Sequence, residues 1–458
     1  MPNPAATSRP RRRALEAILN SGVAAWAGAL VISAALTVPA MAQTTAPEQD
    51  PRRARAGAKV TGEMNPEERS GPSGDEERVH EAFQPKGIEL GEFLLLPKIE
   101  FDETYNSNLH AVESGGRSDF VTTIRPEVKL RSRFKEHAIN LSALAEQYVH
   151  RRFTKDNRLD LQLDVDGRYD FTSETQANYF GQVFSRHEER GSPDDARGLE
   201  PTPTQGFVNR GSIKHQFGRF TVVGEGGLDR RTYGNVMTAL GSTVRNDDRD
   251  RWEMLVRGRG SYEMFPGYAA VTELTANRRL YDSSLDRNGY DRSSHGYRVE
   301  SGIGLDLSKL IRGDFLVGYL AQDYRDPRFH DPKGLSLRAT FNWTPTTLTI
   351  VVPSLERSVN ETTISRSSSM VRNALSLTVR HELERNIVLS GYTAVFYDEF
   401  QGVDDQNAWT YEARGRITYA FTPEFFVGSE IGHRQKRSQA VGASFKQSIV
   451  TLRAGLQL

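Results

Sequence analysis

Residues 159–171 read LDLQLDVDGRYDF, with apolar, aromatic or glycine residues at the odd positions and polar residues at the even ones. Side chains on a β-strand alternate between its two faces, so this stretch predicts a ribbon with one apolar and one charged face. Soluble β-sandwiches alternate in the same way, but their strands usually run about five or six residues. A stretch of 13 residues is long enough for a tilted strand to cross a bilayer and emerge.

The same period of two recurs along residues 88–458, most clearly in residues 120–134, 252–264 and 409–421. The polar face of these stretches is charged along much of its length, as a water-filled lumen allows. A lipid-exposed sheet edge would leave backbone groups unpaired in hydrocarbon, so such a sheet must close on itself. The sequence therefore predicts an all-β fold consisting of a single closed antiparallel transmembrane β-barrel.

Two kinds of connection alternate along the predicted barrel. Tight turns are expected at residues 134–137, 172–175, 218–219, 265–268, 309–313, 344–346, 384–386 and 422–424. Longer polar loops, with one short member, are expected at residues 106–116, 153–157, 188–205, 234–250, 282–294, 323–333, 357–368, 400–407 and 434–442. Together they predict 18 strands, with 16 as the alternative because residues 219–233 and 346–360 alternate weakly. Short turns belong in the periplasm, so an even number of strands places both ends of the barrel there.

Composition excludes several classes of protein. The chain has 458 residues, 59 basic and 59 acidic residues, and no cysteine, and its mean hydropathy is −0.56. The absence of cysteine excludes a disulfide scaffold and any thiolate metal site. A single apolar run near the N-terminus excludes a helical transporter, which needs many such runs. The balanced charge gives no case for nucleic acid as a partner.

The first 87 residues predict an export signal and a spacer. Residues 1–42 carry a basic segment, an apolar stretch at 17–39 and a small-x-small triplet at 40–42, which together indicate a signal peptide. Residues 43–87 are rich in proline, glycine and charged residues and predict a disordered periplasmic spacer. A retained membrane anchor is the alternative for the first segment. A docking arm for a periplasmic partner or for peptidoglycan is the alternative for the second.

The start of the predicted barrel carries short motifs in a recognisable order. They are LGEFLLLP at residues 90–97, YNSN at 105–108, SDF at 118–120 and IRP at 124–126. This order resembles a family of outer-membrane β-barrel porins of Gram-negative bacteria. The resemblance implies a barrel over residues 88–458 in the cell outer membrane. Some members of that family are linked to surface polysaccharide, which implies a role in polysaccharide export with periplasmic export proteins as partners. The family has no agreed catalytic residues, so none is assigned.

The C-terminal residues carry a further signal. Residues 448–458 alternate and end in GLQL. This ending resembles the terminal signal read by the barrel-assembly machinery, although Leu458 stands where an aromatic residue is usual. We therefore expect outer-membrane lipid and the assembly machinery as partners.

The polar strand faces predict a lumen of mixed charge. The residues expected to line the pore are Arg125, Lys129, Arg131, Arg168, Arg210, Lys214, Arg257, Arg259, Arg298, Arg338, Arg380, Arg414, Arg416, Glu127, Glu253 and Glu412. Charges inside a pore set its selectivity, and the excess of arginine indicates a preference for anions or acidic saccharides. The alternative is that many of these side chains pair across strands and hold the wall. Trp252, Trp343 and Trp409 are expected in aromatic girdles at the two membrane interfaces.

Sequence motifs of catalytic, nucleotide-binding or metal-binding sites are scarce. The sequence has no phosphate-binding loop, no dinucleotide fingerprint, no Gly-x-Ser-x-Gly and no zinc-ligand spacing, so we predict no enzyme, cofactor or metal site. The predicted function is a porin-like channel for polar solutes or an exported surface polysaccharide. One alternative is an outer-membrane enzyme with a rim site at His187, Glu188 and Glu189, or at His433 and Arg434. Another is a structural or adhesive barrel.

Overall fold

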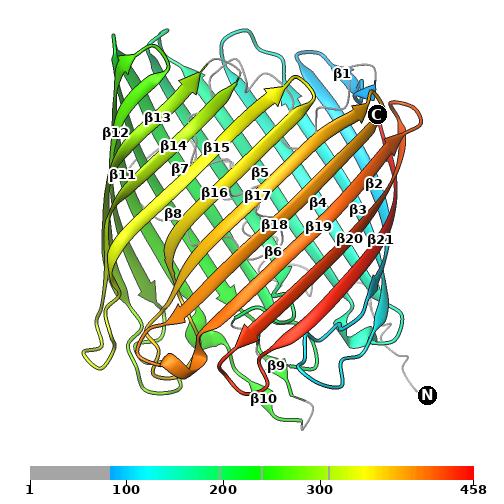
Figure 1. Ribbon diagram of the computed structural model, residues 1–458, viewed down its shortest axis with the longest axis vertical. Coiled ribbons are helices and arrows are strands. Elements are labelled where there is room, and N and C mark those ends of the chain that lie inside the picture. The colour runs from blue at the N-terminus through cyan, green and yellow to red at the C-terminus, as the bar shows by residue number, and fades with distance from the viewer. Residues whose placement is uncertain (1–82, 194, 196–197, 239–240, 308–309) are drawn as a thin grey trace, which may run out of the picture. The chain divides into compact units, whose positions relative to one another are not determined.

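A computed structural model describes residues 83–193, 195, 198–238, 241–307 and 310–458. Within these residues the chain forms one closed antiparallel β-barrel (Figure 1). The predicted signal peptide, and the predicted spacer up to residue 82, lie outside the described residues and stay predictions.

Eighteen strands of 12 to 15 residues build the barrel wall. They are β2 (Phe93–Asn106), β3 (Asp119–Ser132), β4 (Ala138–His150), β5 (Arg158–Asp170), β6 (Thr175–His187), β7 (Pro203–Phe217), β8 (Phe220–Tyr233), β11 (Arg251–Phe265), β12 (Tyr268–Tyr281), β13 (Ser294–Leu307), β14 (Ile311–Tyr324), β15 (Lys333–Thr346), β16 (Thr349–Asn360), β17 (Met370–Glu384), β18 (Ile387–Phe400), β19 (Ala408–Ala420), β20 (Phe425–Ser438) and β21 (Phe445–Gln457). Each pairs with the next, and β21 pairs with β2 to close the sheet. The prediction of 18 strands is confirmed, and the alternative of 16 is wrong.

Short elements complete the described residues. They are strands β1 (Ile88–Leu90), β9 (Val236–Met237) and β10 (Thr243–Val244), and the single-turn helices Thr154–Asp156, Asp247–Arg249 and Asp404–Gln406. In the part of the chain that is described, no helix is long and apolar enough to cross a membrane.

The closing seam is completed by β1. Strand β21 pairs with β2 only from Lys98 to Asn106, and the N–H of Leu458 donates to the carbonyl of Pro97 at 3.1 Å. This would leave the first residues of β2 as an open edge. The β1 strand pairs with that edge, with Ile88 opposite Leu95 and Leu90 opposite Phe93. The edge of β2 is therefore covered by two different segments, as a lipid-facing barrel requires.

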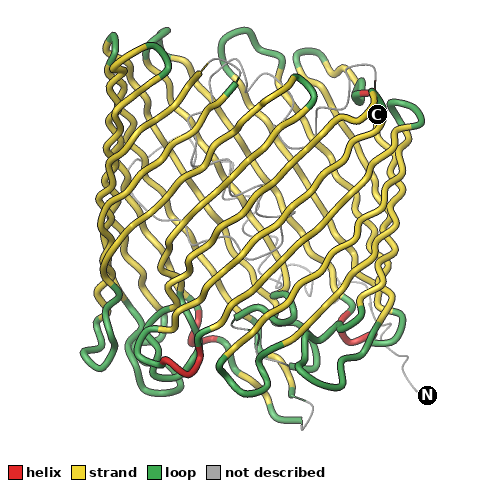
Figure 2. The backbone as a smooth tube through the Cα atoms, in the orientation of Figure 1, coloured by secondary structure: helices red, strands yellow, loops and turns green. Residues whose placement is uncertain are grey.

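Short turns gather at one end of the barrel and longer loops at the other (Figure 2). Since outer-membrane barrels keep their short turns in the periplasm, the barrel starts and ends on that side. Three predicted connections differ most from the structure. The turn expected at 344–346 lies at 347–348, and the loop expected at 434–442 lies at 439–444, because β20 continues to Ser438. The loop expected at 357–368 lies at 361–369, because β16 continues to Asn360.

The first of these errors has a physical cause in proline. Pro345 was interpreted as a turn residue, but it lies inside β15. The β15–β16 register shifts between Trp343 and Thr346, and a strand tolerates a residue without an N–H at such an irregularity. The second error arose because the charged residues of β20 run past the point where a loop was expected.

The apolar strand face points outward and the charged face inward. In β5, Leu159, Leu161 and Leu163 are 46–48% exposed, whereas Asp160 between them is 3% exposed. Trp252 and Trp409 lie at the loop ends of β11 and β19, and Trp343 lies near the turn end of β15. Each end of the barrel wall therefore carries at least one of these three tryptophans. That the tryptophans contact the membrane interfaces stays a prediction.

Candidate functional site

Charged side chains inside the barrel near the seam form a continuous network. The guanidinium of Arg125 donates from Nη1 to Glu100 and from Nε to Glu146, both at 2.7 Å. Arg453 donates from Nη2 to Asp102 at 2.6 Å. These residues come from strands β2, β3, β4 and β21, so the network joins both sides of the closure. Charge-assisted hydrogen bonds of this kind are the strong ones, and removing one partner leaves a buried charge uncompensated.

A second network spans strands that are not neighbours. Arg338 on β15 donates from Nη2 to Glu300 on β13 at 2.8 Å and to Glu273 on β12 at 2.5 Å. Arg259 on β11 donates to Asp314 on β14 at 2.9 Å. Contacts that skip one or more strands require side chains that project into the barrel, so they place these groups in the interior.

Most of the predicted pore-lining residues are members of such pairs. Ion pairs are made by Arg125, Lys129, Arg168, Arg210, Arg257, Arg259, Arg298, Arg338, Arg414, Arg416, Glu127, Glu253 and Glu412. The other three, Arg131, Lys214 and Arg380, lie within the last five residues of β3, β7 and β17, toward the short turns. This arrangement favours the interpretation that the charges hold the wall. The assignment of these residues to an open pore stays a prediction.

Sequence reasoning missed the role of the loop at residues 361–369. Glu361 accepts hydrogen bonds from Arg279 Nη1 at 2.5 Å, from the Tyr281 hydroxyl at 2.5 Å and from the Tyr324 hydroxyl at 3.1 Å. The donors lie on β12 and β14, whereas the loop joins β16 to β17. The loop therefore lies over the outer ends of β12 to β14, and Ser367 and the two residues after it are fully buried.

One arginine fixes the backbone of this loop. Arg292 donates from Nη1 to the carbonyls of Thr362 and Ser367 at 2.7 and 3.1 Å, and from Nη2 to that of Ile364 at 3.3 Å. Its Nε donates to Asp286 at 2.7 Å. A single side chain thus satisfies three loop carbonyls. No local pattern in the serine-rich loop signals this, because the arginine lies about 70 residues earlier in the chain.

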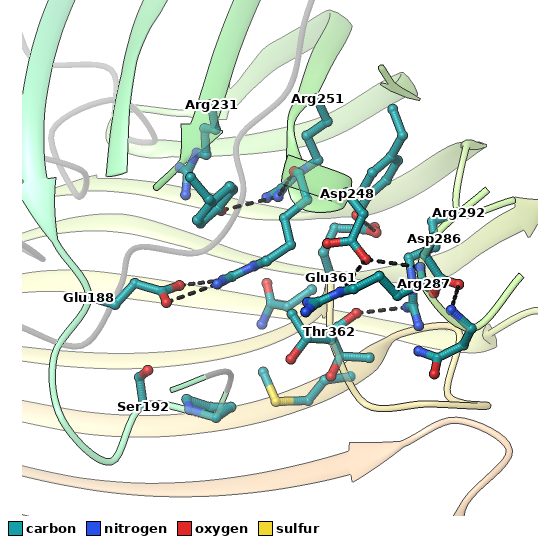
Figure 3. A pocket seen from close by; sticks show the side chains of 18 of the residues that line it. Glu188, Ser192, Arg231, Asp248, Arg251, Asp286, Arg287, Arg292, Glu361 and Thr362 are labelled. Carbon is teal, nitrogen blue, oxygen red and sulfur yellow. Dashed lines mark hydrogen bonds and ion pairs between the residues drawn. The ribbon is translucent and has the colours of Figure 1, made fainter. Parts of the chain in front are cut away.

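A pocket of about 380 Å³ lies at the outer mouth, beside this loop (Figure 3). Its charged lining consists of Arg231, Arg249, Arg251, Arg287, Arg292, Arg372, Glu188, Asp248, Asp286 and Glu361. Six arginines and four carboxylates line the pocket, and Arg251 and Arg372 are paired with Glu253 and Asp398 outside the lining. None of these residues belonged to the predicted pore lining, because most lie in loops or in the first and last residues of strands.

Three outer loops meet at Asp156. Its carboxylate contacts His110 Nε2 at 3.0 Å and accepts from Arg190 Nε at 2.9 Å. Arg190 also donates to the carbonyl of Gly198 at 2.7 Å. Burial raises the pKa of Asp156, but the hydrogen bonds from His110 and Arg190 outweigh it and hold this pKa below its ordinary value. The charged carboxylate therefore joins the loops 107–118, 151–157 and 188–202.

The residues considered for a rim enzyme are separated by the fold. His187 contacts Asp160 at 2.8 Å, whereas Glu188 is paired with Arg249. His433 is exposed and Arg434, its neighbour on β20, is 8% exposed, so their side chains lie on opposite faces. In the described residues, no group of three or more His, Asp or Glu could hold a metal ion. The prediction that the chain is not an enzyme stays a prediction.

Comparison with known proteins gives one family. The family described as "Putative beta-barrel porin 2" matches residues 81–458. No curated protein matches the chain. Similar solved structures include OccK3 (OpdO) of Pseudomonas aeruginosa, at 12% identity over 80% of this chain and 95% of that chain, with a TM-score of 0.38. They also include a BenF-like porin from Pseudomonas fluorescens Pf-5, at 10% identity over 80% and 99%, with a TM-score of 0.40.

Arg292→Ala should release the loop at residues 361–369. The chain has no cysteine, so a Ser367→Cys reporter, buried in the native loop, gives the only thiol. Loss of hydrogen bonds from a charged donor, each worth about 1.5–3 kcal/mol, should speed its reaction with a water-soluble maleimide at least tenfold. Arg287→Ala is the matched control, because that side chain pairs with Asp248 instead. Equal labelling rates in the two variants would contradict the assigned role.

Asp156→Asn should loosen the three outer loops. Removing the charge weakens the bonds to His110 and Arg190, so hydrogen exchange in peptides covering loops 107–118 and 188–202 should rise at neutral pH. The pKa of Asp156 is lowered in the folded protein. The ionised carboxylate therefore stabilises the joined loops fully at neutral pH, and this stabilisation is lost only as the pH falls below the ordinary Asp pKa of about 3.9. Asp247→Asn is the control, since Asp247 pairs with Arg245 in an exposed segment. Unchanged exchange in Asp156→Asn would show that the loops are joined by other contacts.

Proposed function

The chain belongs to the family described as "Putative beta-barrel porin 2", and we propose that its barrel lets small polar solutes diffuse across the outer membrane. The family match and the closed 18-strand barrel identify it as an outer-membrane porin-like channel. The observation that carries the proposal about solutes is the charged interior face. Side chains such as Arg338 and Glu273 project into the barrel, and they provide a polar lining.

Two features of the interior favour small solutes over a polymer. The loop at residues 361–369 lies over the outer ends of β12 to β14 and is held there by Arg292 and Glu361. Interior ion pairs such as Arg259 with Asp314 extend side chains over intervening strands. Both features bring groups inward from the wall, and we infer that they narrow the path of a polymer. Export of a surface polysaccharide rests on the family resemblance alone, and we treat it as an outcome that the experiment distinguishes.

Purified protein reconstituted in planar bilayers should give stepwise conductance. In a vesicle swelling assay, neutral sugars from one to four units should enter at rates that fall steeply with size. Arg292→Ala, which frees the mouth loop, should raise the rate for the larger sugars, whereas the matched Arg287→Ala should not. Absence of any conductance would overturn the channel. Entry of the four-unit sugar as fast as the single sugar would overturn the proposal for small solutes and favour export of a polymer.

A further inference from the structure

We propose that the pocket at the outer mouth binds a small solute that carries one carboxylate and hydroxyl groups. In this site Arg231 binds the carboxylate and Asp248 accepts a hydroxyl. The inference rests on the proposed channel function and names the class of solute that the channel takes up. It concerns residues in the pocket of Figure 3, not the ion pairs of the barrel wall.

Arg231 differs from the other arginines that line the pocket. The others are paired within the protein: Arg249 with Glu188, Arg251 with Glu253, Arg287 with Asp248, Arg292 with Asp286 and Arg372 with Asp398. The Arg231 side chain makes no hydrogen bond or ion pair with the described residues, and its Nε is buried without a partner. Its charge acts on Asp229 and Glu253 but contacts neither carboxylate. Its side chain points from β8 into the pocket (Figure 3). Buried donors are normally satisfied, so this guanidinium is suited to an acceptor brought by a solute.

Asp248 supplies the complementary group. Its Oδ2 accepts from the backbone N–H and from Nε of Arg287, both at 3.1 Å. Its Oδ1 is buried and has no partner among the described residues. An ionised carboxylate can only accept hydrogen bonds, so the group that satisfies this oxygen must be a donor such as a hydroxyl. The pocket thus offers an unsatisfied donor and an unsatisfied acceptor in one lining.

Charge and volume limit the solute further. Each of the other five arginines is paired with a carboxylate, and Glu361 is paired with Arg279. Arg231 therefore leaves an excess of one positive charge, which favours a monoanion over a dianion such as phosphate. A guanidinium presents a planar fork that matches a carboxylate. The pocket volume of about 380 Å³ lies near the lower end of ligand sites, which span about 300–1,000 Å³. Together these limits describe a molecule the size of a single sugar acid.

Calorimetric titration of the detergent-solubilised full chain tests the site. Galacturonate is the probe, and galactose, which lacks the carboxylate, is the neutral control. Galacturonate should bind measurably, and galactose should bind at least tenfold more weakly. Arg231→Gln should weaken galacturonate binding at least tenfold, and Arg231→Lys should weaken it less, because the charge is kept but the fork is lost. Arg245→Gln is the control, since it removes an arginine from the same outer region outside the pocket lining. It should change binding less than twofold.

Each outcome separates the pocket from the channel, because binding in detergent does not require conduction. Equal binding of the two sugars, or full galacturonate binding by both Arg231 variants, overturns the proposed site. Conductance without galacturonate binding overturns the site and leaves the channel standing. Binding that depends on Arg231 supports the site even if bilayers show no current, and that result would overturn the channel alone. Heat-dependent gel migration of each variant confirms that its barrel is folded.

Discussion

The rest of this structure depends on one constraint, which is that backbone groups in the hydrocarbon core of a membrane must hydrogen-bond to one another. Hydrocarbon offers no partner for an N–H or a carbonyl, so every strand of the wall must pair on both sides. The pairing of β21 with β2 meets this requirement, and β1 pairs with the short length of β2 that β21 does not reach. Closure also divides each strand into a face for lipid and a face for the interior, which determines where every charge can lie.

The interior charges follow from that division. A carboxylate such as Glu273, which is 2% exposed, is surrounded by Arg338 and Arg259 from other strands. Pairs of this kind offset the cost of taking charge out of bulk water and also connect strands across the wall. At the outer mouth the same chemistry has another role, because Arg292 and Glu361 hold the loop at residues 361–369 against the outer ends of β12 to β14. Arg231 departs from the rule of paired charge and lies where a solute would enter.

Alternation predicted the barrel because it is a local property: the side chains from residue 159 to 171 carry the pattern by themselves. The number of strands was predictable for the same reason, since turns and loops differ in composition. Pro345 misled the placement of one turn because proline favours both turns and strand irregularities. The contacts of the loop at residues 361–369 and the pocket beside it were not predictable. Their geometry depends on partners such as Arg279, which lies 82 residues from Glu361 in the sequence.

Adjacent residues of one strand face lipid and the barrel interior in turn, and every other feature of the wall depends on this alternation. Gln162→Cys and Leu163→Cys, adjacent positions of β5 in a chain without cysteine, test it by thiol labelling in reconstituted vesicles. We predict that a membrane-impermeant maleimide labels the position 162 thiol and spares the position 163 thiol. A fluorophore at position 163, and not at 162, should be quenched by brominated lipid. Quenching of both positions, or aqueous labelling of both, would contradict the barrel as described.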